Sequence, residues 1–305
     1  MNKRFAAGVL ATIVVPWTDR YQLDEGLFRH EIASMLGAGL RNLYVFGTAG
    51  EGYAVNDAQF ERIARVYVHE VRAGGAEPMV GVISLSLQTI VERIAFARDQ
   101  LGVRLFQISL PSWGALQSDE VRGFFDQVLG TFEDCQFLHY NLLRTKRLVS
   151  AAEYAAIANE HPNLVATKNS TDSMLRIREL IDGAPMLQHF LNERGFAYAS
   201  LNGECGLLAS LATLNWQRAL RYFEAGSTRR MTELLPLEGE LSHIGSALTE
   251  FLGVGHIDAA YDKVLYWLHD ERFPLRLLRP YSSIELERAT QFRDWLRRSY
   301  PEWAA

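Results

Sequence analysis

The chain has 305 residues and a mass of 34.5 kDa, which suits either two ordinary domains or a single α/β barrel. Its 48% hydrophobic and 22% charged residues are typical of a globular protein, and a net charge of -5 gives no indication of a nucleic-acid surface. Two cysteines are too few for a disulfide framework, and no apolar run approaches the roughly 18 residues of a membrane span. We therefore expect a soluble, reduced, cytoplasmic protein that binds neither nucleic acids nor membranes.

From residue 8 to residue 225, apolar runs of strand length alternate with stretches of helical period. The predicted strands cover residues 8–15, 42–46, 78–83, 104–109, 136–140, 164–168, 186–191 and 205–208. The clearest helices cover 23–36, 57–71, 87–101, 119–129 and 151–159, and the eighth helix covers 216–225. We expect Ser150 and Asp57 to cap helices, and Gly37 and Gly102 to end them.

Short connections join these strand–helix units, which favours a closed parallel barrel over an open sheet with Gly-rich dinucleotide-binding turns. We assign residues 1–226 to a (β/α)8 TIM barrel, an α/β fold. Residues 227–305 are predicted to be mostly helical, with helices at 231–244, at 257–268 and, after Pro274 and Pro280, at 283–299. No linker rich in Gly, Ser or Pro precedes this part, so we expect a C-terminal helical extension packed on the barrel.

Because barrel enzymes build their sites at the carboxyl ends of the strands, the residues there are the candidates for chemistry. The second predicted strand is followed by G-T-A-G-E-G at residues 47–52. Its three glycines allow a turn with exposed N–H groups, which suits a carboxylate or phosphate anion, and a purely structural tight turn is an equal alternative.

Tyr140 ends the fifth predicted strand and Lys168 ends the sixth, one repeat later, so we expect them on neighbouring strands. Strand alternation sends either His139 or Tyr140 into the barrel. Only four of the 31 basic residues are lysines, and a lysine at the end of a buried strand must lose its proton, find a partner or lie at an open mouth. A neutral amine attacks a ketone to give an imine, so Lys168 favours Schiff-base chemistry.

These residues and their order resemble the dihydrodipicolinate synthase / N-acetylneuraminate lyase family of Schiff-base barrels, over most of residues 8–225. The G-[ST]-[TS]-G-E pattern of the family corresponds to residues 47–51, its Tyr-Asn pair to Tyr140 and Asn141, and its lysine to Lys168. The G-x-x-G-x-[IL] stretch near the eighth strand corresponds to residues 203–208.

The resemblance implies a lyase or aldolase that uses a Schiff base with pyruvate or a related 2-oxo acid. It implies that Lys168 forms the imine, that Tyr140 moves protons and that Thr48 hydrogen-bonds Tyr140. The amides of Thr48 and Ala49 would hold the substrate carboxylate, and Leu208 would line the pocket. The resemblance implies no cofactor and a homo-oligomer, a tetramer or a dimer.

Several positions depart from the pattern of the synthases. Ala49 lacks the second hydroxyl of the loop, and Trp113 falls near the position of a relay tyrosine that a neighbouring subunit supplies. Thr145 aligns with the arginine for the aldehyde's carboxylate, and Arg144 stands beside it. We therefore expect the pyruvate half of the site to be kept, the partner half to be rebuilt around residues such as Trp113 and Arg144, and the activity to differ from dihydrodipicolinate synthesis.

Two other functions use the same residues: a dehydratase that expels hydroxide from a hydroxylated 2-oxo acid through the same imine, and a non-catalytic barrel that binds a 2-oxo acid. A pyridoxal phosphate enzyme would need a phosphate cup and a partner for the ring nitrogen, and the sequence indicates neither clearly. The eight histidines are scattered without ligand spacing, so we predict no metal site.

Overall fold

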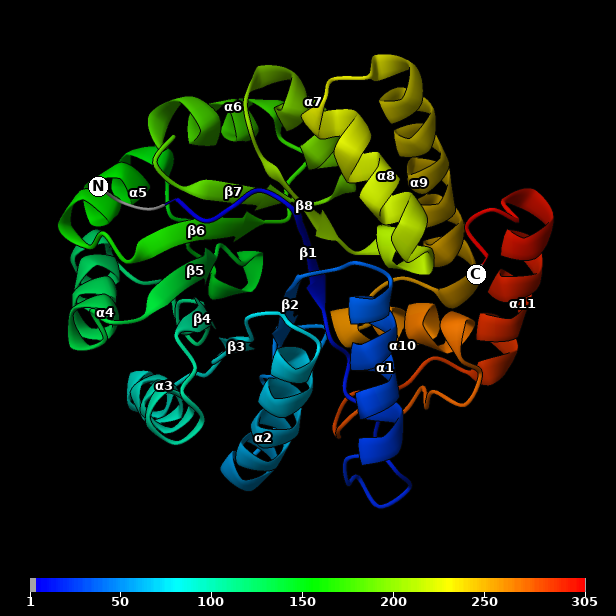
Figure 1. The fold of residues 1–305 in the computed structure, drawn as a ribbon, viewed down its shortest axis with the longest axis horizontal. Coiled ribbons are helices and arrows are strands. Elements are labelled where there is room, and N and C mark those ends of the chain that lie inside the picture. Colours follow the sequence, from blue (N-terminus) through cyan, green and yellow to red (C-terminus); the bar gives the residue numbers. More distant parts are fainter. Residues whose placement is uncertain (1–3, 305) are drawn as a thin grey trace.

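A computed structural model describes residues 4–304 and confirms the predicted barrel (Figure 1). Eight parallel strands follow one another around the barrel, and β8 pairs with β1 to close it. The strands are β1 (Val9–Thr12), β2 (Asn42–Val45), β3 (Met79–Gly81), β4 (Leu105–Ile108), β5 (Gln136–Tyr140), β6 (Leu164–Asn169), β7 (Gln188–Leu191) and β8 (Gly206–Ala209). Each predicted strand corresponds to one of these, although most predicted ranges extend further than the paired residues.

A helix follows every strand and covers the outside of the barrel (Figure 1). Ser150 caps α5 as predicted, whereas Asn56, one residue before the predicted Asp57, caps α2 through a capping box with Gln59. The sequence pattern had not distinguished α6 and α7, which have only 10 residues each. The helices are α1 (Glu25–Gly37), α2 (Asp57–Ala73), α3 (Leu87–Leu101), α4 (Ser118–Thr131), α5 (Ala151–Glu160), α6 (Met174–Gly183), α7 (Glu193–Asn202) and α8 (Trp216–Ser227).

The barrel interior is a packed core. One cluster of buried side chains fills it: Leu10, Tyr44, Met79, Leu105, Leu138, Val165, Ala166, Phe190 and Leu208. A second, larger cluster lies between the strands and the helices. Because apolar side chains fill the interior, a ligand can be bound only where the strands end.

The C-terminal extension consists of α9 (Met231–Leu252), α10 (Asp258–His269) and α11 (Leu286–Ser299). In Figure 1, α9 and α11 lie to one side of the barrel, whereas α10 lies nearer to the strands. Helix α9 packs against α7 and α8, and α11 packs against α9. Buried residues of the extension, such as Leu234, Val264 and Phe292, belong to the same hydrophobic cluster as the outer layer of the barrel. The extension therefore packs on the barrel as predicted; its division from the barrel after residue 226 stays a prediction.

A buried ion pair holds α10 against the loop that follows β2. The Glu51 carboxylate lies 2.8 Å from Lys263 Nζ, and both side chains are fully buried. Glu51 also accepts hydrogen bonds from Trp17 Nε1 at 2.6 Å and from the Leu278 amide at 2.7 Å. Lys263 donates to the carbonyl of Val15 at 3.0 Å. The glutamate of the G-T-A-G-E motif thus connects the barrel to its extension.

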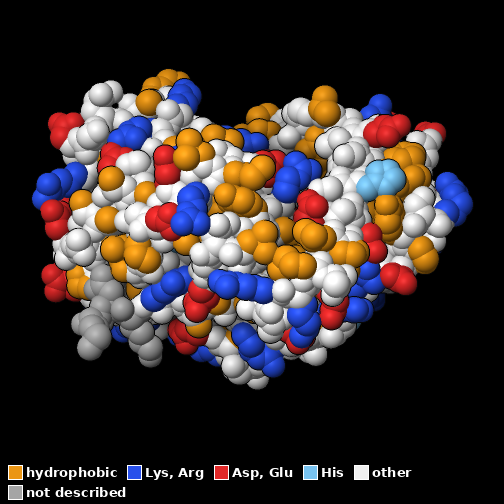
Figure 2. Space-filling view, turned by 90° about the horizontal axis from the view of Figure 1, so that it is seen from above, with side chains coloured by type: hydrophobic (Ala, Val, Ile, Leu, Met, Phe, Trp, Pro, Cys, Tyr) orange, Lys and Arg blue, Asp and Glu red, His pale blue; other side chains and the backbone are white. Residues whose placement is uncertain are grey.

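On the face in Figure 2, acidic and basic side chains are interspersed, so no field of a single sign forms there. No helix among residues 4–304 is long and apolar enough to cross a membrane.

Candidate active site

Lys168 lies where β6 ends, in a cavity of about 790 Å³ at the mouth of the barrel. Its Nζ donates a hydrogen bond to the Tyr44 hydroxyl at 2.8 Å and lies 3.8 Å from the centre of the Tyr140 ring. The lysine is only 3% exposed. Burial lowers the pKa of its amine to about 7, although the negative charge of the nearby Asp258 carboxylate, and that of Asp262 when it is ionised, oppose this shift. Much of the amine is therefore neutral near neutral pH, which a nucleophile requires.

Tyr140 ends β5 directly beside Lys168, because the register pairs these two residues. Its ring lines the cavity, while His139 points to the helices and contacts the Tyr154 hydroxyl at 2.7 Å. Burial raises the pKa of the Tyr140 phenol, and interactions with the side chains of Thr48 and Ser170 partly offset that rise. Thr48 therefore lies near the phenol, and its predicted hydrogen bond to Tyr140 stays a prediction.

The loop after β2 brings Thr48 and Ala49 to the cavity wall. Across the described residues, the backbone N–H groups of Thr48 and Ala49 donate no hydrogen bond within the protein. The glycines beside them serve close packing: a Cβ on Gly52 would lie 2.1 Å from the Phe46 carbonyl oxygen, and one on Gly50 would lie 2.9 Å from that of Ile13. The turn is thus structurally required, and it leaves two amides free to bind an anion.

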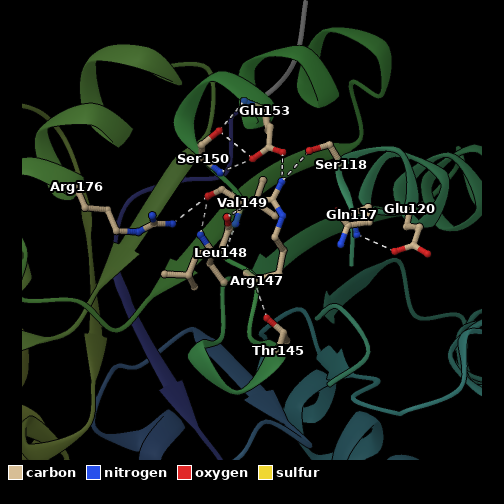
Figure 3. Close-up of polar contacts among 11 residues, drawn as sticks. Gln117, Ser118, Glu120, Thr145, Arg147, Leu148, Val149, Ser150, Glu153 and Arg176 are labelled. Atoms are coloured by element: carbon tan, nitrogen blue, oxygen red, sulfur yellow. Dashed lines mark hydrogen bonds and ion pairs between the residues drawn. The ribbon is translucent and has the colours of Figure 1, made fainter. Parts of the chain in front are cut away.

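A network of polar contacts fixes the segment between β5 and α5 (Figure 3). The Asn141 side chain bonds both the carbonyl and the amide of Val149, each at 3.0 Å. Arg176 donates to the same Val149 carbonyl at 2.9 Å, and Arg147 pairs with Glu153 in the first turn of α5 (Figure 3). Because these contacts fix the chain immediately after Tyr140, they hold the phenol in place beside the lysine.

The structure separates the other residues predicted for the site. Leu208 lines the cavity as an apolar wall, and Arg144 lines it as well. The Arg144 guanidinium makes a bidentate pair with Asp258, at 2.8 and 2.9 Å. Trp113 is 84% exposed on the surface and does not line the cavity of this chain.

Tyr44, Asp258 and Asp262 are among the cavity residues that the sequence analysis missed. Tyr44 points into the barrel from β2 and contacts Lys168. The two aspartates lie one turn apart on α10, among buried neighbours. Their four-residue spacing in a predicted helix was the one sequence signal that they share a helix face. Nothing in the sequence indicated that α10 would reach the strand ends.

Three comparisons place this architecture among known proteins. Residues 5–190 match the model of the dihydrodipicolinate synthetase family. The 4-hydroxy-tetrahydrodipicolinate synthase of Methanopyrus kandleri is 23% identical over 246 residues, covering 77% of this chain and 81% of that protein.

Solved structures share the fold at low identity. A prophage protein of the dihydrodipicolinic acid synthase family from E. coli K12, in complex with pyruvate, has a TM-score of 0.85 at 18% identity and covers 96% of this chain and 98% of its own. CdNal from Clostridium difficile, in complex with mannosamine, has a TM-score of 0.83 at 17% identity, covering 97% and 100%. Because the family model matches well over half of it, the chain belongs to the dihydrodipicolinate synthetase family, a family of barrel lyases and aldolases.

Proposed function

We propose that this protein is a lyase that forms a Schiff base between Lys168 and pyruvate or a related 2-oxo acid, and that it makes or breaks a carbon–carbon bond. The observation that carries the proposal is the Lys168 amine, buried beside two phenols in the cavity with a pKa of about 7. The E. coli family member in complex with pyruvate adds support for this class of ligand.

The free amides of Thr48 and Ala49 are suited to bind the carboxylate of the 2-oxo acid. The neutral amine of Lys168 attacks the C2 carbonyl to give a carbinolamine, and loss of water leaves an iminium ion. Tyr140 is placed to pass protons in these steps, because its ring lies beside Nζ and its hydroxyl contacts Thr48.

The iminium ion acts as the electron sink for the carbon–carbon step. Loss of a C3 proton gives an enamine, which adds to an aldehyde, and cleavage runs the same step in reverse. Hydrolysis of the resulting iminium then releases the product and restores the amine. No metal or cofactor is required, because the imine itself accepts the electron pair.

The partner half of the site supports an activity other than dihydrodipicolinate synthesis. In this chain the Arg144 guanidinium is engaged by Asp258, so it is not free to bind an aldehyde's carboxylate. Trp113 lies outside the cavity. We also propose that the chain forms a homo-oligomer, since Trp113 and Leu143 are large exposed apolar side chains; size-exclusion chromatography with light scattering tests this.

The imine is tested by mass spectrometry of the intact protein after incubation with pyruvate and sodium borohydride. The wild type should carry one reduced pyruvyl adduct, which peptide mapping places on Lys168. Lys168→Arg should carry none, whereas Lys146→Arg, a matched change at an exposed lysine, should label like the wild type. If Lys168 is labelled by neither pyruvate nor a panel of other 2-oxo acids while the fold is intact, the proposal is wrong.

The dehydratase is the second candidate, because it would use the same lysine and tyrosine. Incubating the labelling-competent enzyme with hydroxylated 2-oxo acids separates the two reactions. Release of pyruvate and an aldehyde identifies the aldolase, and loss of water without carbon–carbon cleavage identifies the dehydratase. A protein that forms the imine but neither exchanges the C3 protons of pyruvate nor turns over these acids would be a 2-oxo acid binding protein.

A further inference from the structure

Two carboxyl groups from α10 line the cavity that holds Lys168, and their surroundings differ. Asp258 is engaged by Arg144 and by the side chain of Thr48. Asp262, one turn further along, is 8% exposed, and none of the described residues makes a hydrogen bond with its carboxyl group. Because its carboxyl group lines the cavity without a hydrogen-bond partner among residues 4–304, a ligand bound there can supply the hydrogen bond.

Besides these aspartates and His256, the described acidic and basic side chains of the cavity wall are Arg144, Lys168 and Glu193, and each of them is engaged or would be used by the reaction. The Glu193 carboxylate accepts hydrogen bonds from the amides of Ser210 and Ala212, at 2.7 and 3.0 Å. The Arg144 guanidinium forms an ion pair with Asp258, and the Lys168 amine would form the imine. Once the first part of a substrate is bound, the described arginine and lysine of the cavity wall therefore leave neither a free guanidinium nor a free ammonium group for a second substrate carboxylate.

Asp262 can supply the hydrogen-bond partner that a substrate hydroxyl group needs in the cavity. Burial, and then the charge of Asp258, raise the pKa of Asp262 to about 8. Near neutral pH its carboxyl group is mostly protonated, so it both donates and accepts a hydrogen bond, as an alcohol does. Burial raises the pKa of Asp258, but the pair with Arg144 lowers it by more, so Asp258 is ionised. A substrate carboxylate near it would lose its water beside another negative charge, which is unfavourable.

We propose that Asp262, together with the Arg144–Asp258 pair, selects 2-oxo acid substrates whose far end carries hydroxyl groups and rejects those whose far end carries a carboxylate. This inference rests on the proposed function, since the imine at Lys168 defines which end of the substrate is far. Asp262 is the residue that binds the far hydroxyl, and the Arg144–Asp258 pair removes the guanidinium that would otherwise bind a second carboxylate.

The test compares two five-carbon 2-oxo acids by borohydride trapping at Lys168, which requires no turnover. One is 2-oxo-4,5-dihydroxypentanoate, with a hydroxylated far end, and the other is 2-oxoglutarate, with a carboxylate there. The half-saturating concentration of each is divided by the same variant's value for pyruvate, which is too short to reach the far end. The wild type should label with the hydroxylated acid at a concentration at least tenfold lower than with 2-oxoglutarate.

Asp262→Leu should reduce this preference to less than threefold, and Asp262→Asn, which retains a donor and an acceptor, should keep most of it. Asp119→Asn, an exposed aspartate of α4, is the matched control and should keep the wild-type ratio. The inference is overturned if the wild type labels equally well or better with 2-oxoglutarate, or if Asp262→Leu keeps the wild-type ratio. Absence of labelling by all three acids would instead contradict the proposed function itself.

Discussion

Replacing Lys263 by Met should destabilise the protein by about 3–5 kcal/mol, because it removes one partner of a fully buried ion pair. Glu51 would keep the hydrogen bonds from Trp17 and Leu278 but lose its counter-charge. With an unfolding entropy of about 2.1 cal/mol/K per residue, the 305-residue chain loses about 1.6 °C per kcal/mol. The melting temperature, followed by circular dichroism at pH 7, should therefore fall by about 5–8 °C.

Lys146→Met is the matched control, since Lys146 is exposed and its side chain donates a hydrogen bond to the carbonyl of Trp113 at 3.0 Å. Its effect should stay within about 0.5 kcal/mol, or about 1 °C. By the same conversion, a Lys263→Met protein that melts within about 2 °C of the wild type would show that the ion pair does not stabilise the packing of α10 on the barrel.

Three further predictions concern the amine of Lys168. With a pKa of about 7, its neutral fraction rises about tenfold from pH 6 to pH 8, so the initial rate of pyruvate trapping should rise similarly and then level off; a rise that continues to pH 10 would contradict the effect of burial. Tyr44→Phe removes the oxygen that accepts from the ammonium, so the midpoint of this pH profile should move to lower pH, and an unchanged midpoint would count against that contact. Lys168→Met should melt at a higher temperature than the wild type at pH 7, because it removes a buried amine. Between the folded pKa of about 7 and the unfolded value of 10.5, the unfolded wild type binds more protons than the folded one, so the wild type gains stability and the difference in melting temperature should shrink as the pH rises. A difference that is the same at pH 7 and pH 10 would refute this prediction.

The sequence by itself determined the barrel and the central pair of the site. Alternating apolar runs and helical stretches reveal strand–helix units, and consecutive units in a parallel barrel are neighbours. The 28-residue separation of Tyr140 and Lys168 therefore placed them side by side, as the observed register has them. The burial of Lys168 followed as well, because a lysine that ends a short apolar strand is carried to the edge of the core.

Only the tertiary structure decided what surrounds that pair. Arg144 and Asp258 are 114 residues apart, and Lys168 and Tyr44 are 124 apart. No local periodicity in the sequence predicts contacts between residues so far apart. The same pattern of residues could not indicate that Arg144 is neutralised, that Trp113 lies outside the cavity or that Asp262 lies inside it. Local patterns fix elements and their neighbours, whereas the packing of α10 over the strand ends fixes which charges remain free to meet a substrate.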